Sequence, residues 1–600
     1  MKLNRREYLL SAASLLALSS VAAAQEAPDG AAASSGAGTT YSPEIDLRIR
    51  IPMRDGVLLG ATLYLPRGLD KPRPVIFSQT PYTADLYHPE GVDFSRHGYP
   101  YLAVDMRGRG DSEGEFVPLG SDIDDGHDIV EWILSQPFCN GKVAGNGHSW
   151  VGYTQWAAVA GGARLATIVP LSPPWMGVDF PLSNNIFYAF AMPWIMHVDG
   201  RTQRDRLMRD GGLQVSEQLR FLESGMPFSR LDEFFGLESA TFREWVSHPL
   251  QDSYWDQRNP TPQQLADLTI PVLTMCGYFD GDQHGALEFY YRHSEEAGSR
   301  ANHFLVIGPW IHDQVRKPEP ELFGIELGEA SVIDTLKLHR DWFAFAMEDG
   351  PKPEFLRKKV AYYVMEANRW RYADTLDGVS ERYETLYLSS HGNPQSVYHA
   401  GSLLSETPAA DSPPDHYVYD PSDLGGLMLK LTQAQTHLID QTSLLTDAAD
   451  KLIYHTAPFE TDTEVSGVFR FSAWIAIDQP DTDFMVTIHD IAADGSSMFM
   501  SECRLRARHR EGPRTETLIE TTEPLLYQFD RFTFISRLIR AGHRLRLVVR
   551  AHQEIAWQRN YNSPRPVADQ TRADARTVTV RLFHDARHPT ALQVPIGPAA

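Results

Sequence analysis

The sequence has little that would let it bind nucleic acid, a membrane or a metal ion. Its 600 residues include 55 lysines and arginines against 78 aspartates and glutamates, a net charge of −23, which argues against the basic face that a nucleic-acid partner needs. Beyond residue 24, no segment approaches the ~20 consecutive apolar residues of a membrane span. P-loop, G-x-G-x-x-G and H-E-x-x-H motifs are absent, and we expect neither a metal nor a cofactor.

Cysteine is also scarce. Cys139, Cys276 and Cys503 lie far apart and have no spacing typical of a metal site. An oxidising compartment would permit one disulfide, but the odd count leaves one thiol over. Because Cys139 and Cys276 flank apolar runs, we expect buried free thiols instead.

The N-terminus has the composition of an export signal. Arg5 and Arg6 precede the apolar stretch LLSAASLLALSSVAAA, which ends in an A-x-A-type cleavage site at Ala24. This arrangement resembles a twin-arginine signal over residues 1–24, followed by a linker over residues 25–44. A membrane anchor is the alternative, but the apolar run is short. We therefore expect a periplasmic or secreted protein with no membrane association after cleavage.

Residues 45–174 and 266–350 alternate between short apolar runs and helical stretches. Runs such as PVIFSQT and IPVLTMCG lack polar alternation, as strands buried on both faces do. The pattern predicts an α/β fold, a parallel sheet covered by helices. It is interrupted over residues 175–265, where the aromatic-rich segments NNIFYAFAMPWIMHV and SEQLRFLESG indicate helices. We expect this insertion to form a helical cap over the carboxyl ends of the strands, where α/β sheets bind ligands.

The character of the sequence changes at residue 358. Segments such as KVAYYVMEANRWRYA, SGVFRFSAWIAID and HRLRLVVRAH are strand-like and are separated by turns. Helical periodicity is largely absent, so we expect a β-sandwich or jelly roll over residues 358–600.

The stretch GNGHSWVGYTQW places Ser149 directly after a strand-like run. The usual nucleophile elbow reads G-x-S-x-G, whereas here the second glycine, Gly152, comes one position late. A strand, a tight turn at Gly147 and a following helix would suit a nucleophile, and Gly152 can provide close helix packing one position later. On this stretch alone, a serine that merely caps the helix is an equal alternative.

A base and an orienting carboxylate are expected past the ends of later strands, in the order Ser, Asp, His. Asp280 lies just beyond the apolar run that ends at Gly277, and His312 just beyond the run that ends at Gly308. Asp282 is the alternative to Asp280. The alternatives to His312 are His303, His284 and His148, of which His303 precedes its strand and so lies at the wrong end of the sheet.

Together these segments resemble the cocaine-esterase-like family of serine hydrolases, which includes α-amino-acid ester hydrolases, glutaryl-cephalosporin acylases and X-prolyl dipeptidyl peptidases. The family's elbow, G-x-S-Y-x-G, is matched by GHSWVG with Trp150 in place of tyrosine, and it accounts for the displaced glycine. The family's aspartate and histidine motifs are matched by GYFD and GPWIH. The resemblance covers roughly residues 45–600. It implies an α/β-hydrolase core, a helical cap and a C-terminal jelly roll.

The resemblance also implies roles for individual residues. Ser149 would attack an acyl carbonyl, His312 would take and return the proton, and Asp280 would orient the imidazole. The hydroxyl of Tyr82, in SQTPYTAD, and the backbone N–H of Trp150 would form the oxyanion hole. A turn-capping aromatic is the alternative for Tyr82.

The α-amino-acid ester hydrolases of this family hold the ammonium group of the substrate with three carboxylates. This sequence has Asp179, in WMGVDF, and Asp282, in DGDQ, at two of these positions, but Gln283 at the third. We therefore expect an exported serine hydrolase for small esters, amides or short peptides with a free α-amino group. The two aspartates could instead be a helix cap and a loop residue.

Other functions stay open at this point. They are a general carboxylesterase for uncharged acyl esters, an aminopeptidase or dipeptidyl peptidase, a β-lactam side-chain acylase, and a non-enzymatic binding protein that uses the jelly roll. A homo-oligomer is compatible with the sequence.

Overall fold

The computed structural model describes residues 40–599, apart from residues 205–207, 209, 432–437 and 447. The expected export signal and most of the linker lie outside the described residues. Among the residues that are described, no helix is long and apolar enough to cross a membrane.

A ten-stranded sheet forms the core of the N-terminal half, in the order β1-β2-β4-β3-β5-β6-β9-β10-β13-β14. Its strands are β1 (Pro43–Pro52), β2 (Leu58–Pro66), β3 (Arg73–Thr80), β4 (Tyr101–Asp105), β5 (Cys139–His148), β6 (Thr167–Leu171), β9 (Val272–Phe279), β10 (His303–Ile311), β13 (Val360–Val364) and β14 (Arg369–Ala373). The strands from β4 to β13 run parallel to one another. The edge strands β1, β2 and β14 are antiparallel to their neighbours.

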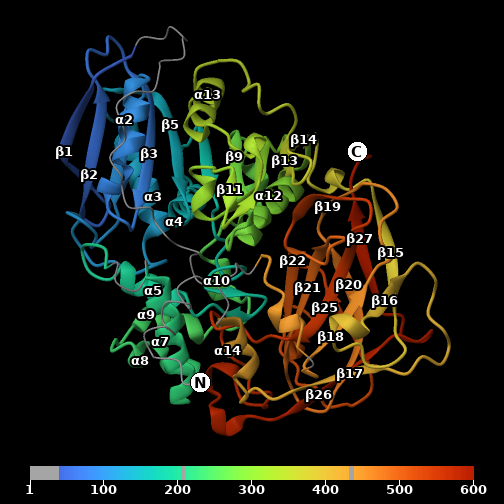
Figure 1. Ribbon diagram of the computed structural model, residues 1–600. Coiled ribbons are helices and arrows are strands. Elements are labelled where there is room, and N and C mark those ends of the chain that lie inside the picture. The colour runs from blue at the N-terminus through green and yellow to red at the C-terminus, as the bar shows by residue number, and fades with distance from the viewer. Residues whose placement is uncertain (1–39, 205–207, 209, 432–437, 447, 600) are drawn as a thin grey trace.

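Helices cover both faces of this sheet (Figure 1). They are α2 (His88–Arg96), α3 (Asp122–Leu134), α4 (Trp150–Ala160), α12 (Gln283–Ala297) and α13 (Thr335–Met347). Side chains of β3 alternate between the faces: Val75 and Phe77 share a core with α3 and α4, whereas Ile76 shares one with α2 and α13. Apolar residues on both sides explain why these strands lack polar alternation in the sequence.

The insertion between β6 and β9 forms a cap of short elements, drawn in green below the sheet in Figure 1. They are β7 (Leu182–Ser183), β8 (Ile186–Phe187), α5 (Ala191–His197), α7 (Gly211–Ser224), α8 (Leu231–Phe234), α9 (Ala240–Val246), α10 (Ser253–Asp256) and α11 (Pro262–Asp267). The predicted helix over residues 184–198 is wrong at its start. Asn184 and Asn185 both have positive φ, 48° and 62°, and form the two-residue turn of the β7–β8 hairpin, as asparagines favour.

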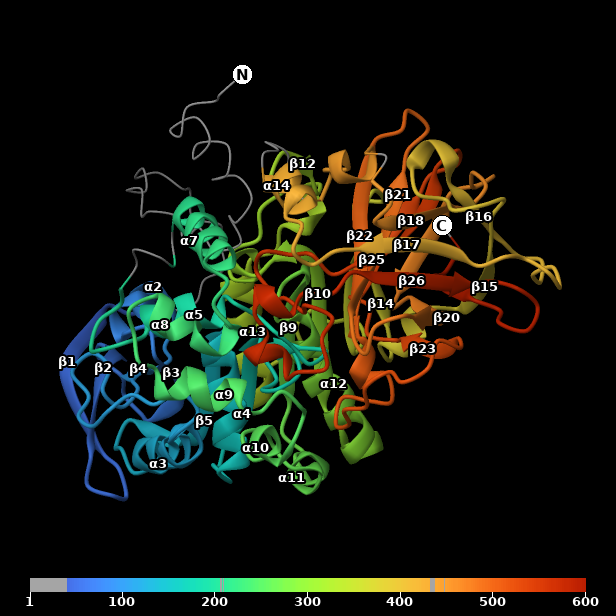
Figure 2. The ribbon, with the colours of Figure 1, turned by 90° about the horizontal axis from the view of Figure 1, so that it is seen from below.

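The C-terminal region is a thirteen-stranded sheet, drawn in yellow to red in Figure 2. Its strands are β15 (Arg382–Ser389), β16 (Gly401–Leu404), β17 (Asp415–Tyr419), β18 (Lys451–His455), β19 (Thr463–Gly467), β20 (Arg470–Ile477), β21 (Asp483–Ile491), β22 (Ser497–Arg506), β23 (Leu525–Phe529), β24 (Ile535–Ile539), β25 (Arg544–Ala551), β26 (Val578–Phe583) and β27 (Ala591–Ile596). Most pairs are antiparallel, and β16–β18 is a parallel exception. The expected β-rich domain is present, and its closer description as a jelly roll stays a prediction.

The predicted start of this domain at residue 358 stays a prediction, but the first strand after it belongs to the N-terminal sheet. Residues 360–364 form β13, which pairs in parallel with β10 and thereby extends the N-terminal sheet. The run is apolar and fully buried, as expected for a strand that follows the crossover helix α13. The C-terminal sheet begins only at Arg382.

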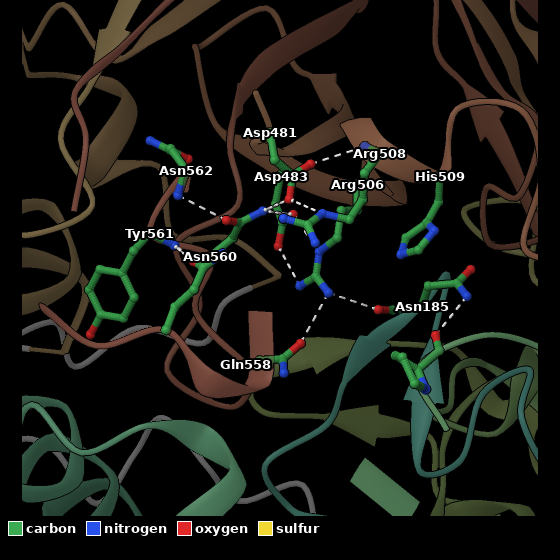
Figure 3. Close-up of polar contacts among 12 residues, drawn as sticks. Asn185, Asp481, Asp483, Arg506, Arg508, His509, Gln558, Asn560, Tyr561 and Asn562 are labelled. Atoms are coloured by element: carbon green, nitrogen blue, oxygen red, sulfur yellow. Dashed lines mark hydrogen bonds and ion pairs between the residues drawn. The ribbon is translucent and has the colours of Figure 1, made fainter. Parts of the chain in front are cut away.

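A buried ionic network joins the C-terminal domain to the cap (Figure 3). Arg506, at the end of β22, binds both oxygens of Asp483 and donates to the backbone oxygen of Asn185 in the cap hairpin, at 3.0 Å. Asn560 donates to Asp481 and Asp483. Paired in this way, the buried charges hold the hairpin against the C-terminal domain.

The three cysteines are free thiols. Cys276 and Cys503 are buried, but Cys139 is partly exposed because it opens β5 at the edge where the strand enters the sheet, so its predicted burial is corrected.

Candidate active site

The expected catalytic residues follow the carboxyl ends of neighbouring parallel strands. Ser149 follows β5, Asp280 follows β9 and His312 follows β10, while Tyr82 lies two residues beyond β3. Because the strand order is β3-β5-β6-β9-β10, these ends meet at one edge of the sheet. A further residue, Ser172, follows β6 at the same edge.

Ser149 occupies a strained turn between β5 and α4. Its φ of 63° and ψ of −128° lie outside the regions that side-chain-bearing residues favour, as in a nucleophile elbow. Its hydroxyl does not cap α4, which argues against a purely helix-capping serine. A Cβ at Gly147 would overlap Val151, and one at Gly152 would lie 2.8 Å from the Leu171 backbone oxygen. The displaced glycine therefore lets the helix pack against the end of β6.

His312 and Asp280 form the expected pair. The imidazole Nδ1 lies 2.7 Å from Oδ1 of Asp280, whereas Asp282 is 3.8 Å away, so the geometry favours Asp280 as the orienting carboxylate. Asp280 also accepts hydrogen bonds from the backbone N–H of Asp282 at 2.9 Å and from the hydroxyl of Ser172. The sequence analysis missed Ser172, although its position directly after a buried strand was a usable signal.

Two of the alternative histidines have other roles. His303 begins β10 at the opposite edge of the sheet and lies within hydrogen-bonding distance of Thr274 and His293. His148 packs its ring 4.2 Å from that of His312, which brings the elbow and the catalytic histidine together. Burial and the charge of His312 lower the pKa of His148 well below its usual value, so the imidazole of His148 beside the catalytic histidine is neutral.

The pairing of Asp280 with His312 shifts the pKa values of the two groups in opposite directions. Burial alone would disfavour both charged forms, but the mutual attraction of the two groups outweighs it. The pKa of Asp280 is therefore held below its ordinary value, and that of His312 is held above it. The pairing stabilises the imidazolium that forms when the histidine accepts a proton.

Two hydrogen-bond donors are available for an oxyanion. The phenol of Tyr82 is a polar partner of Ser149, and burial raises its pKa to about 12, which keeps it protonated. Trp150 is the first residue of α4, and an amide in a first helical turn has no acceptor inside the helix. Its N–H is therefore free for a substrate oxygen.

A cavity of about 320 Å³ lies beside the Asp280 carboxylate, between the core, the cap and the C-terminal domain. Its acidic lining residues are Asp179, Asp280, Asp282, Asp440, Glu502 and Glu554. Its arginines are Arg504 and Arg550, each of which is paired with a glutamate. Neither Ser149 nor His312 lines it. The excess of carboxylates favours a cationic ligand.

Asp179 and Asp282 both border this cavity, but they differ in their contacts. The carboxylate of Asp179 accepts hydrogen bonds from the backbone N–H of Trp175, at 2.9 Å, and of Gly285, near the start of α12. Burial, with the charge of Asp282, raises the pKa of Asp179 well above its usual value. Burial also raises the pKa of Asp282, to about 7.

The predicted role of Gln283 in substrate binding is corrected. Its side-chain amide donates to the backbone oxygens of Gly277, Tyr278 and Phe534 and accepts from the Phe534 N–H at 2.7 Å. Gln283 is fully buried and is not among the residues that line the cavity. It fastens α12 to β9 and to the C-terminal domain.

One group among the described residues has the spacing of a metal site, namely Asp280, Asp282 and His312, whose ligand atoms lie within 4.8 Å of one another. The donor set would suit a divalent cation. However, Nδ1 of His312, the ring nitrogen nearest both aspartates, donates to Asp280. Metal binding and the triad arrangement are therefore mutually exclusive at this nitrogen.

Both halves of the chain match family models of known proteins. Residues 55–314 match the X-Pro dipeptidyl-peptidase (S15 family), and residues 356–593 match the C-terminal non-catalytic domain of X-Pro dipeptidyl-peptidases. The chain is 27% identical to a cocaine esterase of Rhodococcus sp. (strain MB1 Bresler), with 91% of this chain and 98% of that protein aligned.

Two solved structures share the fold along almost the whole chain. An α-amino acid ester hydrolase superposes with a TM-score of 0.78 at 21% identity, over 96% of this chain and 100% of the other. An aminopeptidase from the marine sediment archaeon Thaumarchaeota archaeon superposes with a TM-score of 0.77 at 23% identity, over 96% and 99%.

Proposed function

The chain belongs to the X-Pro dipeptidyl-peptidase (S15) family of serine hydrolases, and we propose that it hydrolyses esters or amides whose acyl group carries a free α-amino group. The observation that carries the proposal is the placement of two carboxyl groups, Asp179 and Asp282, on the wall of a cavity beside Asp280, where burial raises the pKa of both. An ammonium group between them would relieve their mutual repulsion and restore the ionised forms.

In the proposed reaction, Ser149 attacks the acyl carbonyl while His312 takes its proton. Asp280 holds the imidazole in the required tautomer and stabilises the imidazolium. The Tyr82 hydroxyl and the Trp150 N–H stabilise the oxyanion, each donor typically contributing on the order of 3 kcal/mol. His312 then protonates the leaving group, and water hydrolyses the acyl-enzyme by the reverse use of the same groups.

A carboxylesterase for uncharged acyl groups is the second candidate. Both oxygens of Asp179 already accept backbone hydrogen bonds, and the amide of Gln283 is turned away from the cavity. These contacts favour a site in which Asp179 is mainly structural. The aminopeptidase alternative differs from the main proposal only in the leaving group, because it requires the same ammonium site.

The two candidates are separated by a matched pair of substrates, phenylalanine methyl ester and methyl 3-phenylpropanoate, which differ only in the amino group. We expect the wild type to favour the amino ester. Asp282→Asn should lower kcat/KM for the amino ester at least thirtyfold more than for the other ester, since an unpaired buried charge typically costs about 2–5 kcal/mol.

Asp440→Asn is the matched control, because Asp440 lines the same cavity but is contributed by the C-terminal domain. It should leave the preference between the two esters nearly unchanged. Equal losses on both substrates in Asp282→Asn, or a wild type that favours the des-amino ester, would favour the general carboxylesterase.

We further propose that the protein is exported. The support is the order of Arg5, Arg6, the apolar stretch and the small residues before Gln25, which is typical of a twin-arginine signal.

A further inference from the structure

A tryptophan of the cap contacts both residues of the proposed oxyanion hole. Trp194, in α5, is buried, and its indole N–H donates to the hydroxyl oxygen of Tyr82 at 3.0 Å. The same ring stacks on Trp150 with 4.4 Å between ring centroids. Trp194 therefore contacts both residues that supply oxyanion donors.

The contact fixes the direction of the Tyr82 hydroxyl. An indole N–H can only donate, so the phenol oxygen must accept from Trp194, and its own proton points elsewhere. The side chain of Ser149 is a further polar neighbour of this phenol. The proton of Tyr82 is thus directed toward the position where the reacting oxygen will sit.

We propose that Trp194 is a positioning residue for the oxyanion hole. It holds the phenol in the orientation in which its O–H donates to the oxyanion. It also makes that phenol a stronger donor, because the hydrogen bond from Trp194 to Tyr82 and the one from Tyr82 to the oxyanion polarise one another. The inference rests on the proposed role of Tyr82. Because Trp194 belongs to the cap, catalysis then depends on the packing of the cap against the core.

The second donor is held in the same way. The indole of Trp150 donates to Asp122 at 3.2 Å and lies against Trp194 on its face. The two indoles of Trp150 and Trp194 thus form one stack beside the elbow. Asp122 and Trp194 therefore restrain the residue whose backbone N–H begins α4.

The test is Trp194→Phe, which keeps an aromatic ring but removes the N–H. Methyl 3-phenylpropanoate is the substrate, because it lacks the amino group and so does not involve the ammonium site. We expect kcat to fall about tenfold with KM changed less than twofold, since oxyanion donors act mainly in the transition state. Trp245→Phe is the matched control: Trp245 stacks on Trp194 at 6.3 Å but does not hydrogen-bond Tyr82.

A double variant separates positioning from general loss of structure. If Trp194 acts through Tyr82, Trp194→Phe should have almost no additional effect on kcat in the Tyr82→Phe background. An unchanged kcat in Trp194→Phe, or the same tenfold loss in both backgrounds, would overturn the proposal.

If Trp194→Phe does not fold, 3-benzothienylalanine at position 194 replaces the N–H with sulfur at almost the same ring size, and the same outcomes apply. Turnover by the wild type and its loss in Ser149→Ala test the hydrolase activity separately. If Trp194 has no positioning role, the wild type still shows turnover that depends on Ser149. If the proposed hydrolase function is wrong, no such turnover is found.

Discussion

Asp282 should set the pH at which the catalytic histidine becomes active. Its carboxylate lies 3.8 Å from Nδ1 of His312, and the two side chains are 17% and 23% exposed. At an effective dielectric constant of about 20, two full charges at this distance attract by about 4 kcal/mol. That energy corresponds to a change of about 3 in the pKa of the histidine.

The real change is smaller because both side chains are partly exposed, so that solvent screens the attraction between them. We therefore expect Asp282→Asn to lower the pKa of His312 by about 1 to 2. Removing a negative charge destabilises the imidazolium, so the neutral base is available at lower pH. The acid limb of kcat/KM should then move to lower pH by the same amount.

The assay is kcat/KM for methyl 3-phenylpropanoate between pH 5 and 10, because this ester has no group that titrates in the range. Asp440→Asn, which removes a charge from the same cavity but is not among the leading charges that act on His312, should leave the limb in place. An acid limb that stays put in Asp282→Asn, or moves to higher pH, would refute the electrostatic reasoning.

Four other substitutions test separate parts of the molecule. Ser149→Ala should abolish turnover with little change in melting temperature, and appreciable activity in the folded variant would move the nucleophile elsewhere. Tyr82→Phe should lower kcat by about 10²–10³-fold, and an effect on KM alone would make it a pocket residue. Gln283→Leu should destabilise the fold by about 1–3 kcal/mol in urea without changing the ester preference, which a changed preference would contradict. Replacing Arg5 and Arg6 by lysine should retain an uncleaved precursor in the cytoplasm, whereas normal export would exclude the twin-arginine route.

The sequence predicted the strands of the core sheet well because both faces of these strands are buried. An unbroken apolar run is not compatible with a surface element, and the predicted run that ends at Gly308 forms most of β10, His303–Ile311. The positions just after such runs then predicted Ser149, Asp280 and His312, since carboxyl ends of parallel strands share one edge. The cap was harder, because its elements are short and their ends depend on local turns such as Asn184–Asn185.

Side-chain contacts between residues far apart along the chain could not be predicted from the sequence. Ser172 reaches Asp280 over 108 residues, and Trp194 reaches Tyr82 over 112. Nothing in the sequence around Ser172 or Trp194 indicates its partner. The partners are brought together only by the order of the strands in the sheet and by the folding of the cap. Only the position of Ser172, after a buried run, offered a signal.

Gln283 shows why a residue's place in a motif does not fix where its side chain points. A carboxylate at this position could accept but not donate, so the three carbonyl oxygens near it would repel the charge. The amide can do both, and it binds those carbonyls together with the N–H of Phe534. Glutamine at this position therefore directs its side chain into the fold. Of the two aspartates of the proposed ammonium site, Asp179 already accepts hydrogen bonds from two backbone amides, so Asp282 is the more informative residue to change.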